Sequence, residues 1–255
     1  QLGEIWGYVV DGYFKTDEEA RNYKVDQSFV NQMINASALD NGLHAGDLKF
    51  VDLDGNNKIE QTTSANDRKD MKVIGNSLPR YNYNFGISAD WYGIDFSVLF
   101  QGIGKQNWYP GAETSMFWGP YSRPYASFIP SDFMSQVWSE ENTDAYFPRP
   151  RGYVALGSNR ELAVVNTKYL QNLAYCRLKN LSIGYTLPDK WLSKIGFEKI
   201  RVYFSGENLL TFTKLHSDYI DPEQASASNS WKTSKSDANI YPWAKTYSFG
   251  VDITF

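Results

Sequence analysis

The stretch YNYNFGISADWYGIDFSVLFQ, Tyr81–Gln101, carries a clear β-structure pattern. Apolar and polar side chains alternate along its first half, where Tyr, Phe, Ile, Ala and Trp are separated by Asn, Gly, Ser and Asp. The phase reverses at Tyr92–Gly93, and the alternation resumes at Ile94. A period of two is typical of a β-strand with one apolar and one polar face, and two such runs joined through a glycine predict a β-hairpin.

Similar alternating runs follow along the chain, at 180–188, 198–212 and 246–255. The last of them, TYSFGVDITF, is the most regular, and its apolar positions are Tyr247, Phe249, Val251, Ile253 and Phe255. Each run approaches the roughly nine to eleven residues that a tilted strand needs to cross an outer membrane. Long stretches of loop composition lie between the runs, near 107–167 and 216–241.

Two all-β architectures fit this pattern. A soluble β-sandwich packs one face of each strand on a core, whereas a transmembrane barrel turns its apolar face to lipid. The polar faces here carry Asn, Ser, Gly, Asp and Thr but little Lys or Glu, and the apolar faces end in Tyr and Trp, as an interfacial girdle would. Short turns that alternate with long loops are also a barrel feature. The sequence therefore favours an antiparallel transmembrane β-barrel.

The overall composition excludes several classes of protein. The 255 residues carry a formal net charge of −4, which gives no reason to expect nucleic acid as a partner. No apolar run is long enough for a transmembrane helix, and the single cysteine, Cys176, cannot form an internal disulfide. His44 and His216 are far apart in the sequence and have no patterned nucleophile or acid beside them. We therefore do not expect an enzyme.

A series of motifs in a fixed order resembles one family. WGYVVDGYF, GDLKFVDLDGNNKIE and LPRYNYNFGISADWYGIDFSVLFQGIG are followed by YLQNLAYCRLKNLSIGYTLPDKWL, IRVYFSGENLLTFTK, DYIDPE and SFGVDITF. Together they resemble the C-terminal portion of SusC/RagA-type TonB-dependent outer-membrane transporters, over essentially the whole chain, 1–255. The resemblance implies a plugged barrel of about 22 strands, of which this chain supplies the last. The plug and the N-terminal strands have no counterpart here, so we expect Gln1 to begin a piece of a longer protein.

The same resemblance implies a function and a set of partners. The intact protein would lie in the outer membrane of a Gram-negative member of the Bacteroidota and import oligomeric nutrients, glycan or peptide. Its partners would be a SusD-like surface lipoprotein, TonB acting through the missing plug, the barrel assembly machinery and outer-membrane lipid. Two alternatives remain open: a soluble β-rich carbohydrate-binding module and a β-sandwich glycoside hydrolase.

The acidic loop DLDGNNKIE is a candidate metal site. Oxygen ligands fall at alternate positions, on the side chains of Asp52, Asp54, Asn56 and Glu60 and on the carbonyl of Lys58, in the spacing that begins an EF-hand loop. The usual glycine is replaced by Asn57, and the usual closing glutamate is absent, so Asp67 is a candidate for the remaining ligand. Calcium or magnesium is the expected ion, and the alternative is a turn whose side chains cap its own backbone.

Two further sets of aromatic residues are candidates for function. In the first long loop, rings that could stack on sugars or contact a partner interleave with Gly and Pro, and these are Trp108, Tyr109, Trp118, Tyr121 and Tyr125. The alternative for this set is packing of the rings on one another or at the membrane interface. In the last strand, the apolar set ending at Phe255 resembles the C-terminal aromatic signal recognised by the barrel assembly machinery, and we expect this set to face lipid.

Overall fold

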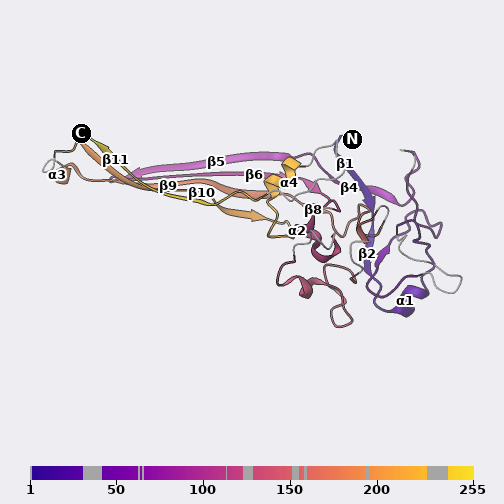
Figure 1. Cartoon of the computed structure of the whole chain (residues 1–255). Coiled ribbons are helices and arrows are strands. Elements are labelled where there is room, and N and C mark those ends of the chain that lie inside the picture. Colours follow the sequence, from indigo (N-terminus) through magenta and orange to yellow (C-terminus); the bar gives the residue numbers. More distant parts are fainter. Residues whose placement is uncertain are drawn as a thin grey trace.

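The computed structural model describes residues 2–30, 42–62, 64, 66–112, 114–122, 129–150, 155–157, 160–192, 196–228 and 241–255. They form a long, narrow sheet with a globular lobe at one end of it (Figure 1). Helices α1 (Asp17–Arg21) and α2 (Ser115–Trp118) lie in the lobe, as does the N-terminus, whereas the C-terminus lies at the far end of the sheet.

The sheet is an antiparallel meander of five long strands. Each strand pairs with the one that follows it in the sheet order, and all four pairings are antiparallel. The strands are β5 (Arg80–Trp91), β6 (Ile94–Lys105), β9 (Tyr175–Thr186), β10 (Lys199–Thr213) and β11 (Thr246–Thr254). The predicted hairpin within Tyr81–Gln101 is confirmed as β5–β6, and the predicted strand at the end of the chain is confirmed as β11.

The β5–β6 connection explains why this hairpin contains a glycine. Tyr92 and Gly93 both have positive φ, 46° and 84°, as a two-residue type I′ turn requires. A Cβ on Gly93 would lie 2.8 Å from the carbonyl oxygen of Thr186 on β9. Position 93 therefore needs glycine both for its backbone conformation and for the close approach of a neighbouring strand.

The register of the pairings gives the sheet two different faces. One transverse row joins apolar residues of all five strands, and the next row joins serines of all five strands. The apolar row is Ala89, Phe96, Ile183, Phe204 and Phe249, and the polar row is Ser88, Ser97, Ser182, Ser205 and Ser248. Because a slip of one residue would move every side chain to the other face, the alternation in the sequence fixes this register.

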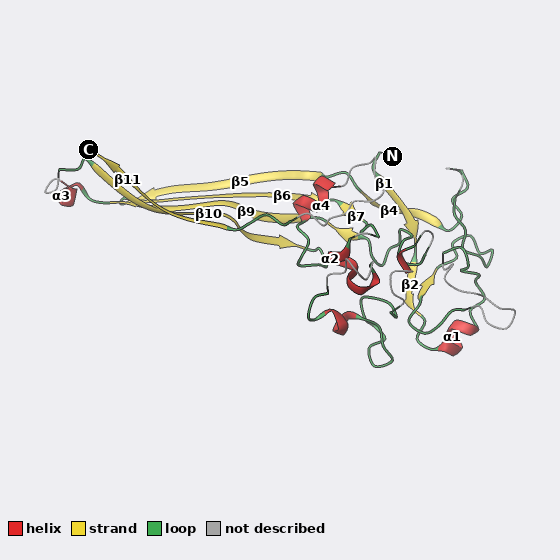
Figure 2. Cartoon of the chain, in the orientation of Figure 1, coloured by secondary structure: helices red, strands yellow, loops and turns green. Residues whose placement is uncertain are grey.

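The lobe is built from small sheets, short helices and loops around an aromatic core (Figure 2). Three two-stranded sheets contribute to it: β1 (Glu4–Tyr8) with β4 (Met71–Asn76), β2 (Val10–Tyr13) with β3 (Leu48–Phe50), and β7 (Asn107–Trp108) with β8 (Gln171–Asn172). The short 3₁₀ helices η1 (Gly119–Tyr121) and η2 (Phe133–Gln136) lie in the same part of the chain as α2.

The connections between the long strands differ at the two ends of the sheet. At the far end, β5 and β6 are joined by two residues and β9 and β10 by 187–198, which contains α3 (Asp189–Leu192) (Figure 1). At the lobe end, 106–174 joins β6 to β9, and 214–245, with α4 (Pro222–Ser228), joins β10 to β11. The stretch near 107–167 thus contributes much of the lobe core in addition to its loops. Within the described residues, no helix has the length and apolar character needed to cross a membrane.

Candidate functional site

An ionic network of one arginine and two aspartates lies on the polar face near the far end of the sheet. Arg201 on β10 donates from Nε and Nη2 to the two carboxylate oxygens of Asp95 on β6, at 2.8 and 2.6 Å, and from Nη1 to Asp252 on β11 at 3.2 Å. Between Asp95 and Arg201 lies Gly184 on β9, where a Cβ would come within 2.4 Å of the Asp95 carboxylate. Glycine at this position therefore lets a bidentate ion pair span three strands.

A second ionic network lies at the lobe end of the same face. Arg177 on β9 is 2% exposed and donates to Thr211 Oγ1 at 2.9 Å, to Asp221 Oδ2 at 2.6 Å and to Glu223 Oε2 at 2.8 Å. Lys179 Nζ lies 2.9 Å from the same Glu223 oxygen. Because a buried charge is tolerated only when it is fully paired, this network fixes the start of α4 against β9.

Trp243, just before β11, is held by the same network. Its backbone N–H donates to Asp221 Oδ2 at 3.3 Å, and its ring lies 5.6 Å from Lys179 Nζ. The side chain nevertheless stays 51% exposed. Trp243 was not among the candidates from the sequence, because a tryptophan beside a proline in a loop gives no indication of which residues it contacts.

The acidic loop has the turn geometry that the sequence suggested. Asp52 accepts hydrogen bonds from the backbone of Gly55 at 2.7 Å and of Asn57 at 2.6 Å. Asn57 has a φ of 62°, so this asparagine takes the left-handed conformation in which glycine is usual. Asn56 Oδ1 accepts from Lys58 N at 2.8 Å. These bonds are those of the self-capping turn, and they leave the metal prediction untested.

The structure brings Asp70 to this loop, where the sequence suggested Asp67. Oxygens of Asp52, Asp54 and Asp70 all lie within 4.8 Å of one another. Asp70 is buried and accepts from the backbone N–H groups of Leu53 at 2.9 Å and Glu60 at 2.7 Å. Its burial raises the pKa of the Asp70 carboxyl. Asp67 instead lies 3.6 Å from Lys69, whose ammonium also lies 3.4 Å from Glu60.

The loop aromatics proposed as ligand contacts lie in the core of the lobe. Trp108 is 1% exposed, Trp118 0% and Tyr121 1%, so these three rings offer no free face to a ligand. Tyr109 packs against the same core and donates its hydroxyl hydrogen to the Leu162 carbonyl at 2.8 Å. For these four residues the structure corrects the ligand-binding interpretation in favour of packing, because aromatic rings bury large apolar surfaces. Tyr125 lies outside the described residues.

The apolar set of β11 is exposed along its whole length. Phe249 is 83% exposed, and the other members, Tyr247, Val251, Ile253 and Phe255, are exposed as well. Phe249 lies in the apolar row of the five strands, which fits the expectation that the set faces lipid. Its recognition by the assembly machinery stays a prediction.

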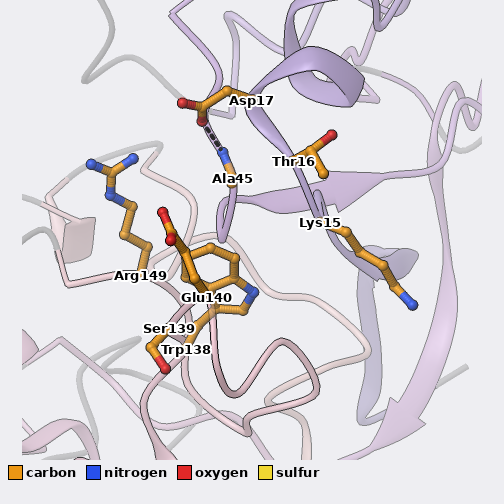
Figure 3. A pocket seen from close by; sticks show the side chains of 8 residues that line it. All are labelled: Lys15, Thr16, Asp17, Ala45, Trp138, Ser139, Glu140 and Arg149. Carbon is orange, nitrogen blue, oxygen red and sulfur yellow. Dashed lines mark hydrogen bonds between the residues drawn. The ribbon is translucent and has the colours of Figure 1, made fainter.

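A cavity of the lobe lies between the segment before α1 and the chain around Trp138 (Figure 3). It has a volume of about 620 Å³ and is lined by Lys15, Thr16, Asp17, Ala45, Trp138, Ser139, Glu140 and Arg149. The backbone N–H of Ala45 donates to Asp17 at 2.9 Å, which holds the pKa of that carboxyl below its usual value. Trp138 Nε1 is buried, and no described residue accepts its hydrogen.

The sheet is a meander of long antiparallel strands that is apolar on one face and polar on the other. Its connections are short at one end and long at the other. These features are those of part of the wall of a transmembrane β-barrel.

No protein-family model matches the chain. Among curated proteins it is similar to TonB-dependent receptor P3 of Formosa agariphila, 31% identical over 212 residues, which cover 81% of this chain and 19% of the relative. It is also similar to receptor P39 of the same organism, 25% identical, over 100% of this chain and 25% of the relative. The chain belongs to the TonB-dependent receptors.

Solved structures show the same fold. The chain superimposes on the RagAB peptide importer in its open-open state with a TM-score of 0.57 and 20% identity, over 99% of this chain and 22% of that chain. A structure of the RagAB peptide transporter gives a TM-score of 0.56. These matches confirm the predicted all-β barrel fold. The predicted outer-membrane localisation and a class that is not enzymatic are confirmed by the similarity to the TonB-dependent receptors. The chain spans about a fifth to a quarter of the length of the curated relatives it matches.

Proposed function

We propose that the whole receptor imports oligomeric nutrients, glycan or peptide, across the outer membrane, with energy supplied through TonB and with a SusD-like surface lipoprotein as its partner. The observation that carries the proposal is the pair of adjacent rows across the five strands, one apolar and one of serines. A wall with these faces separates lipid from a hydrated lumen. The membership in TonB-dependent receptors and the fold shared with RagAB support the same conclusion.

The polar face suits the passage of large hydrophilic solutes. A row of serines crosses the polar face, and the charged groups of Arg201 and Arg177 are paired with carboxylates. Paired charges hold a passing solute less tightly than isolated ones would. The plug, the TonB contact and the remaining strands would come from parts of the receptor outside this chain.

Deletion of the receptor gene tests this proposal. Cells that lack the gene should lose uptake of a fluorescent oligosaccharide or oligopeptide that wild-type cells accumulate, and cells that lack TonB should show the same loss. Co-purification of a surface lipoprotein with the tagged receptor tests the partner. Unchanged uptake of both types of oligomer in the deletion strain would refute the import function.

We also propose that the acidic loop binds one calcium or magnesium ion, with Asp52 and Asp54 as ligands and Asp70 as the additional carboxylate. The mutual approach of their oxygens within 4.8 Å supports this second role, because hard cations prefer clustered oxygen ligands. Asn56 remains a side-chain candidate, the Lys58 carbonyl a backbone candidate, and Glu60 would first have to leave Lys58 and Lys69. Chelation of the purified receptor should speed amide exchange across 52–60, and added calcium should restore it. Identical exchange before and after chelation would exclude the ion.

A further inference from the structure

A small cavity on the polar face of the sheet brings together side chains from three strands and one loop. It has a volume of about 280 Å³ and is lined by Leu99, Gln101, Lys179, Asn180, Glu207, Asn208 and Trp243. The lining strands are the adjacent β6, β9 and β10. The volume lies just below the range of about 300–1,000 Å³ for pockets that hold a whole ligand, which suits one unit of a longer chain.

The position of Trp243 in this cavity is built by the rest of the fold. Its backbone N–H donates to Asp221, and Lys179 lies over its ring. Asp221 is itself held by Arg177, and Lys179 by Glu223. The exposed indole is therefore fixed in place by a buried ionic network, and it does not have to be ordered when a ligand arrives.

Besides Lys179, the polar groups around the ring are amides and one carboxylate. Within the part of the chain that the structure describes, the side chains of Gln101, Asn180 and Glu207 make no hydrogen bond or ion pair, and all three are exposed. Asn208 has a φ of 53° at the irregularity where β10 changes register against β9, and its Oδ1 is enclosed without a described partner. Side-chain amides offer donors and acceptors side by side, as neighbouring hydroxyl groups of a sugar require.

The charges of the cavity disfavour an anionic ligand. Its cation, Lys179, is already paired with Glu223, and the nearby Arg177 is paired with two carboxylates. A peptide carboxylate or an acidic side chain would find no unpaired cation among these groups. A half-exposed indole face beside side-chain amides and the Glu207 carboxylate, which can accept from hydroxyl groups, instead matches the apolar face and the hydroxyl edge of a pyranose ring.

We propose that the Trp243 cavity, lined also by Gln101, Asn180 and Glu207, is a saccharide-binding subsite on the inner wall of the barrel, which takes one sugar unit of a neutral glycan by stacking on Trp243. This inference rests on the proposed import function and names glycan as the cargo at this site.

Binding to the purified full-length receptor in detergent tests the subsite. The probes are maltotetraose, cellotetraose, laminaritetraose and xylotetraose, with tetra-alanine as the peptide probe, followed by titration calorimetry and ligand-observed NMR. At least one tetrasaccharide should bind. Trp243→Ala should weaken its binding by about 10-fold, the effect of removing one stacked ring, and Trp243→Phe by less. Gln101→Leu should weaken binding without a change in fold.

The matched control is Trp191→Ala, because Trp191 is an exposed tryptophan of α3 at the opposite end of the sheet. This variant should bind the sugar as the wild type does. Absence of binding by all four tetrasaccharides, or equal affinity of the wild type and Trp243→Ala, overturns the subsite. Tetra-alanine binding that depends on Trp243 overturns the sugar assignment. Uptake assays in cells report on the import function separately, so a receptor that imports without this binding would refute only the subsite.

Discussion

Replacement of Arg177 by methionine tests whether its ionic network anchors the loop that carries Trp243. Methionine keeps an unbranched apolar stem of similar length but removes the charge and all donors. The guanidinium that is lost makes hydrogen bonds of 2.6 Å to Asp221, 2.8 Å to Glu223 and 2.9 Å to Thr211. After the substitution, Glu223 keeps Lys179, whereas Asp221 keeps hydrogen bonds from backbone groups such as Trp243 N–H but has no cation.

The expected cost follows from this asymmetry. Removal of one partner from a buried ion pair costs about 3–5 kcal/mol, and the remaining Lys179 contact places Arg177→Met near the lower bound, about 3 kcal/mol. The loop and α4 make few hydrogen bonds to the strands. The substitution should therefore first lower the free energy of local opening of this segment. A loss of about 3 kcal/mol in opening free energy corresponds to amide exchange roughly 100-fold faster.

Hydrogen exchange of the full-length receptor, read by mass spectrometry over 220–225, measures this effect. The control is Lys58→Met, which removes an exposed ion pair with Glu60 in the acidic loop and should cost at most about 1 kcal/mol. Quenching of Trp243 fluorescence by acrylamide should rise in Arg177→Met alone. Exchange over 220–225 within about twofold of the wild type, where roughly 100-fold is expected, would show that the network does not anchor the loop.

Three further predictions concern the two faces of the sheet and the lobe. Ile183→Arg, in the apolar row, should cost about 2–4 kcal/mol of folding free energy in lipid vesicles, because the arginine would face lipid. The control Ser182→Arg, on the polar face, should cost much less. Equal folded fractions of the two variants on a heat-modifiability gel would contradict the assignment of the faces. Gly184→Val would place a Cβ within 2.4 Å of the Asp95 carboxylate and should lower stability by about 1–3 kcal/mol, read as a lower urea midpoint; an unchanged midpoint would mean that the ion pair can move aside. Partial removal from water, by a Tyr146 ring stacked 3.5 Å away, holds the pKa of His216 below its ordinary value of 6.5, although the residue keeps an exposed part. The unfolded chain therefore binds this proton more tightly, and stability of the lobe should fall as the pH drops below about 6.5 and less so in His216→Phe, which thermal melts from pH 8 to 5 would test.

The features that were predicted correctly from the sequence are local ones. The hairpin of β5 and β6, its turn at Tyr92–Gly93 and the last strand were all predicted from alternation and turn chemistry. In the acidic loop, Asn57 stands where glycine is usual and takes the left-handed conformation of that position, which asparagine tolerates. The sequence did not find Asp70, because the choice between Asp67 and Asp70 depends on how the chain after the loop returns to it.

The long stretches between strands were harder to interpret. Trp108, Trp118 and Tyr121 lie in a stretch with the composition of an exposed binding loop, yet they form part of the lobe core. Trp243 was overlooked, and its exposed ring is held by groups on β9 and α4. Burial and exposure of a loop aromatic are set by contacts with distant residues, which composition does not encode.

Alternation alone predicted the strands and their two faces, because it follows from backbone geometry and is present in each strand separately. The outer-membrane barrel family was indicated by the resemblance of the ordered motifs. The tertiary structure settled which aromatics are buried and which face the polar wall. It also decided that Arg177 meets Asp221 and Glu223, separated from it by 44 and 46 residues. Such pairings depend on the path of the connecting loops, and the periodicity of the strands does not predict that path.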